Sequence, residues 1–155
     1  MNKEELMMRA CQLAEESVRQ GGGPFGAVIA RNGEIIAEGS NCVTIHHDPT
    51  AHAEVTAIRK ATKALATHDL SGCEIYTSCE PCPMCLGAIY WAHIDRLYYA
   101  CNKYDAADAG FDDSFIYKEL ALTKDERRLK TEILIPEEAK RIFEEWKNNE
   151  DKTEY

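Results

Sequence analysis

Two short segments of the chain contain residue types that can bind a metal ion together. His52 lies in the segment 51–54, and Cys82 and Cys85 lie in the segment 81–85. Imidazole nitrogen and thiolate sulfur are ligands that zinc takes in tetrahedral geometry. Cysteines three positions apart at the start of a helix face one side, and the positive end of the helix dipole favours their thiolate forms. We therefore expect His52, Cys82 and Cys85 to hold one zinc ion.

Glu54 is the candidate proton carrier beside that ion. Three protein ligands leave the fourth position of a tetrahedral zinc ion to water, which is the arrangement of a catalytic zinc site. Glu54 comes two residues after His52, about 200° round a helix, so we expect it to stand beside the water and transfer protons rather than bind the metal. The alternative is a closed structural site with Cys79 as the fourth ligand. We favour the open site because Cys79 is expected to end a strand, whereas Cys82 and Cys85 open a helix.

A glycine-rich segment, residues 21–26, matches the letters of a dinucleotide-binding fingerprint. That fingerprint follows a strand and opens a helix. Here the segment is expected to follow a helix and to open a strand, and no P-loop lysine comes after it. We interpret it as a turn that lets the backbone approach a pocket.

Hydrophobic periodicity and turn signals predict the elements that position these residues. Asn32-Gly33 is a strong hairpin signal, and Thr50 can cap the helix that carries Glu54. We expect helices over residues 3–20, 51–66, 84–92, 114–119 and 136–148, and strands over residues 25–31, 34–39, 73–78, 96–101 and 129–135. Helices that alternate with strands indicate a central sheet covered on both faces, and the opening hairpin makes that sheet mixed.

The composition of the 155-residue chain limits its function classes. We expect one domain of ordinary size, and no apolar run approaches the roughly 18–20 residues that a membrane span needs. The net charge of −9 repels phosphate backbones, so we expect no nucleic-acid partner and leave open a small neutral ligand. The start lacks the pattern of a signal peptide, and the seven cysteines are an odd number, so we expect reduced thiols and a cytoplasmic location.

With these motifs, the sequence resembles the cytidine deaminase-like superfamily of zinc hydrolases, and within it the small bacterial guanine deaminases. The similar stretches are residues 22–28, 48–59, 76–92 and 109–119. The His-x-Glu and Pro-Cys-x-x-Cys pattern is the signature of zinc deaminases. The resemblance implies a three-layer α/β/α fold with a five-stranded mixed sheet, a homodimer, and one Zn²⁺ per subunit. It also implies conversion of guanine and water to xanthine and ammonia, with Glu54 as the proton carrier.

The resemblance also implies residues that contact the purine. Asn41 matches a ring-binding asparagine whose amide offers a donor and an acceptor, although an asparagine in a loop can instead satisfy its own turn. Phe25 and Trp91 can sandwich a flat ring, or can be core aromatics. Asp113 can accept hydrogen bonds from the guanine, with Asp112 as its rival, and both can instead cap the next helix.

The C-terminal part of the chain is a further candidate piece of the site. Tyr155 is a single aromatic residue in a polar tail, which indicates docking over an active site, whereas the alternative is a frayed end. The resemblance implies that the helix and tail, about 136–155, are exchanged between the subunits of a dimer.

Other functions share the zinc motif. A tRNA-specific adenosine deaminase attacks a flipped base and needs a basic surface around its pocket, which a chain of net charge −9 does not favour. A guanosine deaminase needs room for a ribose. A zinc fold without catalysis, used for binding, is the alternative outside the enzymes.

Overall fold

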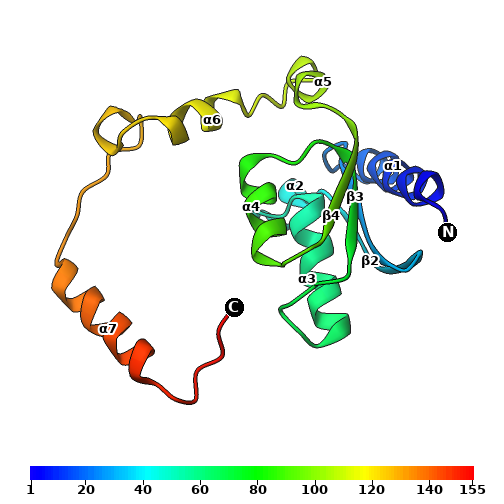
Figure 1. Ribbon diagram of the computed structural model, residues 1–155. Coiled ribbons are helices and arrows are strands. Elements are labelled where there is room, and N and C mark those ends of the chain that lie inside the picture. The colour runs from blue at the N-terminus through cyan, green and yellow to red at the C-terminus, as the bar shows by residue number, and fades with distance from the viewer. The chain divides into compact units, whose positions relative to one another are not determined.

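The computed structural model describes residues 1–155, and the chain forms two compact units (Figure 1). The first unit comprises Met1–Asp113 and the second comprises Ser114–Tyr155. The predicted zinc ligands all belong to the first unit. No helix of the chain combines the length and the apolar character that a membrane span requires.

The first unit is built on a mixed sheet of four strands in the order β2-β1-β3-β4. Its elements are α1 (Lys3–Arg19), β1 (Gly26–Arg31), β2 (Glu34–Ser40), α2 (Val43–His46), α3 (Ala53–Leu65), β3 (Glu74–Cys79), α4 (Pro83–Trp91), β4 (Arg96–Cys101) and α5 (Lys103–Asp108). β1 pairs antiparallel with β2 and with β3, and β3 pairs parallel with β4. The mixed character of the sheet is confirmed, but the expected number of five strands is wrong.

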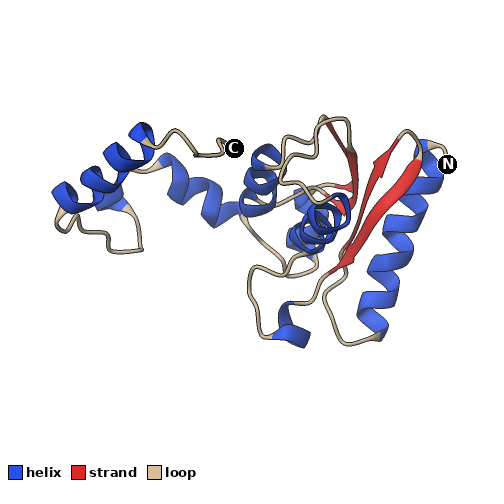
Figure 2. Ribbon diagram, turned by 90° about the horizontal axis from the view of Figure 1, so that it is seen from below, coloured by secondary structure: helices blue, strands red, loops and turns tan.

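The sheet has a layer of helices on each face (Figure 2). α1 covers one face, and the buried residues there are Leu6, Ala10, Leu13, Val28, Ala30 and Tyr76. α3 and α4 cover the other face, where the buried residues include Ala27, Ile29, Ala53, Ala57, Ala61, Ile75 and Ile89. Alternate residues of β1 therefore point to opposite layers, as a strand with both faces covered requires.

The hairpin between β1 and β2 forms as the sequence predicts. Asn32 and Gly33 have φ angles of 52° and 78°, and a two-residue hairpin turn with both central residues at positive φ is of type I′. Asparagine and glycine adopt this conformation with the least strain, so the turn fixes the register of the first two strands.

The expected cap of the second long helix is wrong. α3 begins at Ala53, and His52 rather than Thr50 is the residue at its N-cap. The Thr50 hydroxyl donates to Oδ1 of Asp48 at 2.7 Å, and the Thr50 amide donates to the same oxygen at 2.9 Å. Asp48 thus uses Thr50 in a side-chain turn, and this leaves the first position of the helix to His52.

The second unit contains α6 (Ser114–Ala121), a 3-10 turn η1 (Lys124–Glu126) and α7 (Pro136–Asn148). The helix predicted over residues 136–148 has the bounds of α7. The strand predicted over residues 129–135 is absent from the sheet, which accounts for four strands instead of five. A strand is held by hydrogen bonds to a neighbour, and the second unit holds no other strand with which residues 129–135 can pair.

Candidate zinc site

The three predicted zinc ligands meet where two helices begin. His52 is the N-cap residue of α3, Cys82 is the N-cap residue of α4, and Cys85 lies one turn further along α4. Nδ1 of His52 lies 3.6 Å from Sγ of Cys82 and 3.4 Å from Sγ of Cys85. Donor atoms around a tetrahedral zinc ion stand about 3.5 Å apart, so the spacing of this group fits that metal.

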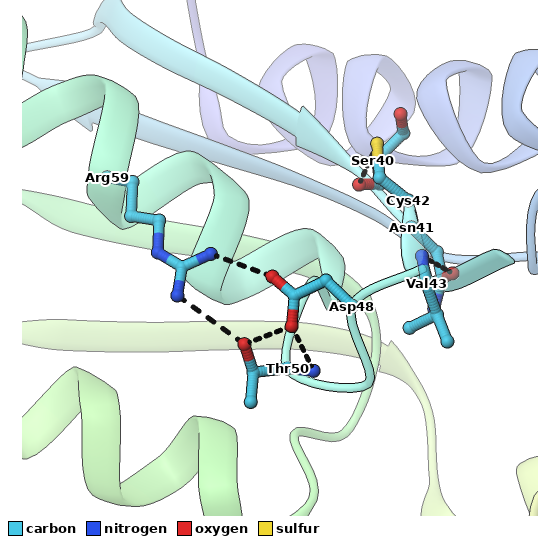
Figure 3. A network of polar contacts seen from close by, with 7 residues as sticks. All are labelled: Ser40, Asn41, Cys42, Val43, Asp48, Thr50 and Arg59. Carbon is cyan, nitrogen blue, oxygen red and sulfur yellow. Dashed lines mark hydrogen bonds and ion pairs between the residues drawn. The ribbon is translucent and has the colours of Figure 1, made fainter. Parts of the chain in front are cut away.

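Side-chain hydrogen bonds of Asp48, Thr50 and Arg59 hold the loop before α3 (Figure 3). His52 is the last residue of this loop. The amide of Cys42, just after β2, donates to the carbonyl of Ala51 at 2.9 Å. The guanidinium of Arg59, one to two turns into α3, donates to both Asp48 and Thr50 at 3.4 Å. The segment before His52 is therefore tied to the end of β2 on one side and to α3 on the other.

The loop before α4 is tied to the opposite edge of the sheet. The amide of Glu80 donates to the carbonyl of Cys101 at 2.7 Å, and Oε1 of Glu80 accepts from the amide of Lys103 at 3.1 Å. Pro83 occupies the first position of α4, where the missing amide hydrogen has no intrahelical partner in any case. This start of α4 places both cysteine sulfurs near His52.

Cys79 lies outside the group of ligand atoms. Its thiol donates to the carbonyl of Asn102 at 3.7 Å, and burial raises its pKa to about 11. The structure therefore favours the open site over the closed alternative.

The pKa values of the two cysteine ligands are shifted in opposite directions. The hydrogen bond with the Cys85 thiol and the contact with His52 together lower the pKa of Cys82 to about 4, against the effect of burial. The same hydrogen bond raises the pKa of Cys85. The pair thus holds one thiolate before any metal arrives, and the second proton leaves when the metal binds.

Glu54 is a buried carboxyl group beside these ligands. Its side chain is in the first turn of α3 and the residue is 7% exposed. Burial raises the pKa of Glu54, and the nearby Cys82 thiolate raises it further. A carboxyl group with a raised pKa holds a proton more readily than an exposed one does, which suits the predicted role of proton carrier.

Two of the predicted purine contacts, Asn41 and Phe25, lie side by side. The backbone amide of Asn41 donates to the backbone carbonyl of Phe25 at 3.2 Å, and Asn41 is 7% exposed. The Phe25 ring meets the Phe111 ring edge-on, with centroids 5.0 Å apart. Because Cys42 bonds to Ala51, this pair also lies next to the segment that carries the zinc ligand of α3.

Asp113 is within electrostatic reach of a zinc ligand. Burial raises its pKa, and the charge of Cys82 raises it further. Asp112 acts on Asp113 as a neighbouring like charge. Asp113 is half-buried, whereas Asp112 is exposed.

Two other predicted purine contacts, Trp91 and Tyr155, are not brought to the zinc ligands by the fold of the first unit. Trp91 lies at the last turn of α4, opposite to the end that carries Cys82, and it is 67% exposed. It lines a shallow groove with residues of α3, among them Val55 and Ile58. Tyr155 belongs to the second unit. The ring sandwich of Phe25 and Trp91 is therefore not formed in this chain alone.

Sequence reasoning missed two residues that contact the predicted purine-binding residues. Phe111 packs against Phe25, and nothing in the local pattern of residues 102–113 indicates this long-range contact. Ser17 reaches Gly23 and Asn41 with its hydroxyl group. A signal for Ser17 was present, since it falls on the apolar face of the predicted first helix, where a polar residue needs a partner.

A mixed sheet between helices, with His, Cys and Cys at two helix starts and a buried glutamate beside them, defines the zinc-dependent deaminase class. A family model described as the cytidine and deoxycytidylate deaminase zinc-binding region matches residues 1–101. The chain belongs to this family, and zinc is its metal.

Two guanine deaminases are similar over more of the chain than the family model covers. Guanine deaminase of Bacillus subtilis is 56% identical over 156 residues, which cover 100% of both chains. Its crystal structure matches with a TM-score of 0.97 over 100% of this chain and 99% of that chain. Guanine deaminase of Nitrosomonas europaea matches at 36% identity with a TM-score of 0.70, over 72% of this chain and 65% of its own. A tRNA-specific adenosine deaminase of Aquifex aeolicus is 40% identical over 100 residues, 64% of this chain and 66% of its own.

Proposed function

We propose that this chain is a zinc-dependent guanine deaminase that converts guanine and water to xanthine and ammonia. The observation that carries the proposal is the 56% identity to a guanine deaminase over the whole chain, including the second unit. The similarity to a tRNA-specific adenosine deaminase covers only 64% of the chain. The net charge of −9 also favours a small neutral substrate over a nucleic acid.

The residues of the site divide the reaction between them. His52, Cys82 and Cys85 hold the zinc ion, which when bound lowers the pKa of water toward about 7 and so supplies a nucleophile at neutral pH. Glu54 accepts the proton that the water loses as its oxygen adds to C2 of guanine, and passes it to N3 of the ring. Glu54 then takes the remaining proton from the oxygen added to C2 and transfers it to the amine, so that the C2–N bond breaks, ammonia leaves and C2 becomes a carbonyl carbon.

The purine is bound by side chains around this centre. Asn41 offers its amide to the edge of the ring, and Phe25 offers an aromatic surface to its face. Asp113 accepts hydrogen bonds from N–H groups of guanine. Trp91 and Tyr155 are the remaining proposed contacts with the purine. Because the fold of the first unit brings neither of them to the zinc ligands, we propose that they reach the purine only in the assembled dimer.

The active form that we propose is a homodimer in which the C-terminal part, about 136–155, is exchanged between subunits. The apolar side chains of α7, Ile142, Phe143 and Trp146, are exposed. α4 is apolar on all sides, and a helix of that kind is normally buried, yet Tyr90 and Trp91 on it are 75% and 67% exposed. Both observations support surfaces that a second copy covers. The thiolate ligands need reducing conditions, which support a cytoplasmic location.

A substrate panel tests the proposed activity. Release of ammonia is measured from guanine, guanosine, cytosine, adenine and an anticodon stem-loop RNA, with zinc-loaded protein. We expect guanine to be turned over far faster than the other compounds. Activity on the RNA alone would identify a tRNA adenosine deaminase instead, and zinc-loaded protein that is inert on every compound would indicate a fold used only for binding.

A further inference from the structure

The turn between α1 and β1 has no place in the proposed reaction, yet one of its glycines touches the side chain of Asn41. A Cβ atom added to Gly23 would stand 3.1 Å from Cγ, 3.2 Å from Nδ2 and 3.3 Å from Oδ1 of Asn41, and these are its three nearest atoms. The amide group of Asn41 thus lies flat against the α-carbon of Gly23. A hydrogen atom fits there, whereas a methyl group would push the amide away.

A buried hydroxyl holds this turn in place. Ser17, on α1, is 1% exposed, and its Oγ donates to the carbonyl of Gly23 at 2.7 Å and lies 3.3 Å from the carbonyl of Asn41. The Gly23 carbonyl also accepts from the amide of Phe25 at 2.9 Å. One hydroxyl therefore joins the helix, the glycine turn and Asn41, the residue that follows β2.

The amide of Asn41 is held in one orientation. Its Oδ1 accepts a hydrogen bond from the amide of Val43 at 3.1 Å (Figure 3). With Oδ1 engaged in this way and Gly23 against one side of the amide plane, Nδ2 is the group left to meet a ligand. The side chain is thus set to donate to an acceptor on a purine.

We propose that Ser17 and Gly23 are positioning residues, which orient the amide of Asn41 toward the purine ring and so set the affinity for substrate without touching it. This inference rests on the proposed role of Asn41 in binding guanine. It gives the glycine-rich turn a function that a dinucleotide-binding interpretation does not supply.

The test is a double-mutant cycle on guanine turnover with zinc-loaded protein. We expect Gly23→Ala to raise KM for guanine about tenfold, as the loss of one hydrogen bond does, with kcat changed by less than about threefold and zinc content unchanged. Added to Asn41→Ala, it should cause no further rise in KM, because both changes remove the same contact. Gly87→Ala is the matched control, since a Cβ there meets no atom within 4 Å, and it should leave KM unchanged.

Ser17→Ala gives an independent arm that adds no atoms to the turn. It should also raise KM for guanine, and this effect should likewise disappear in the Asn41→Ala background. The positioning role is overturned if Asn41→Ala raises KM while Gly23→Ala and Ser17→Ala do not, or if their effects multiply with that of Asn41→Ala. An unchanged KM in Asn41→Ala overturns the proposed binding role of Asn41 and the positioning role with it. Wild-type protein without guanine turnover overturns the proposed function itself.

Discussion

A carboxyl group that is 7% exposed and close to a thiolate is an unfavourable place for a negative charge. Glu54 occupies such a place at the start of α3, next to His52 and within reach of Cys82. If stability were the only requirement, a neutral side chain at this position would suit the fold better than a carboxyl group. Its position is explained by proton transfer, which needs a base that can also become an acid.

Glu54→Gln should therefore abolish most of the turnover without disturbing the metal site. Glutamine has the size of glutamate but cannot accept and release a proton, and general acid–base catalysis contributes about 10²–10⁴-fold. Ammonia release from guanine should fall by at least that factor, while metal analysis should find one zinc per chain. Exposed Glu4 provides the control, and Glu4→Gln should behave as wild type. Unchanged turnover in Glu54→Gln would contradict the mechanism.

The zinc ligands were predictable because their geometry is local. Cys82 and Cys85 are separated by one helical turn, and His52 stands at the start of its own helix, so sequence spacing fixes their directions. Trp91 was harder to assign. It lies on a helix that is apolar on all sides, and no periodicity tells which side faces the substrate and which faces another chain. Phe111 and Ser17 act through contacts with distant parts of the chain, which spacing does not encode.

At the scale of elements, α1 is joined to the edge strand β2 by one ion pair. Nε and Nη2 of Arg9 donate to the two carboxylate oxygens of Glu38 at 2.6 Å and 2.9 Å. Both side chains are less than one third exposed, at 28% and 32%. The hydrogen bond with Arg9 lowers the pKa of Glu38 from its ordinary 4.5. A paired, half-buried bidentate contact of this kind is more effective than a fully exposed pair.

We expect Glu38→Gln to lower the free energy of unfolding by about 1 kcal/mol at pH 7. Because the pKa of Glu38 is lower in the folded chain, its contribution is fully present above pH 4.5 and is lost as the pH falls through the folded-state pKa. The difference between wild type and variant in urea unfolding should therefore shrink below pH 4.5. Glu34, exposed on the same strand, provides the control, and Glu34→Gln should leave the free energy of unfolding at pH 7 unchanged. A difference that stays constant at acid pH would contradict the role of the charge.

The elements that were predicted well are those whose pattern repeats over many residues. α1 and α7 have one apolar stripe and clear ends, and the hairpin of β1 and β2 has an Asn-Gly turn. The start of α3 was wrong because Asp48 competes for Thr50. The predicted strand over residues 129–135 was wrong. Alternation of apolar residues is compatible with a strand, but a strand forms only where a partner strand is available to pair with it.

At the scale of the whole molecule, the chain leaves apolar surface uncovered in both of its units. In the second unit, α7 exposes Ile142, Phe143 and Trp146, and in the first, α4 exposes Tyr90 and Trp91. Contiguous exposed apolar side chains of this size are typical of surfaces that bind another protein. In the homodimer that we propose, a second copy of the chain would cover both surfaces at once, and a closed dimer is the commonest form of symmetric assembly.

Exchange of the C-terminal part makes a prediction that a simple dimer does not make. One variant is Glu54→Gln with its tail intact, and the other retains Glu54 but lacks residues 150–155, which include Tyr155. We expect each to be inactive alone. If the tail completes the partner's site, a mixed dimer holds one complete site, with Glu54 from one chain and the tail from the other.

Coexpression of the two variants should therefore restore about one quarter of the wild-type activity per chain, since random pairing makes half of the dimers mixed and half of their sites complete. The control replaces the truncated partner by one that also carries Glu54→Gln, and it must stay inactive. A tail that serves its own subunit leaves the first mixture inactive as well, which would refute the exchange. A truncated chain as active as wild type would instead show that Tyr155 has no part in the site.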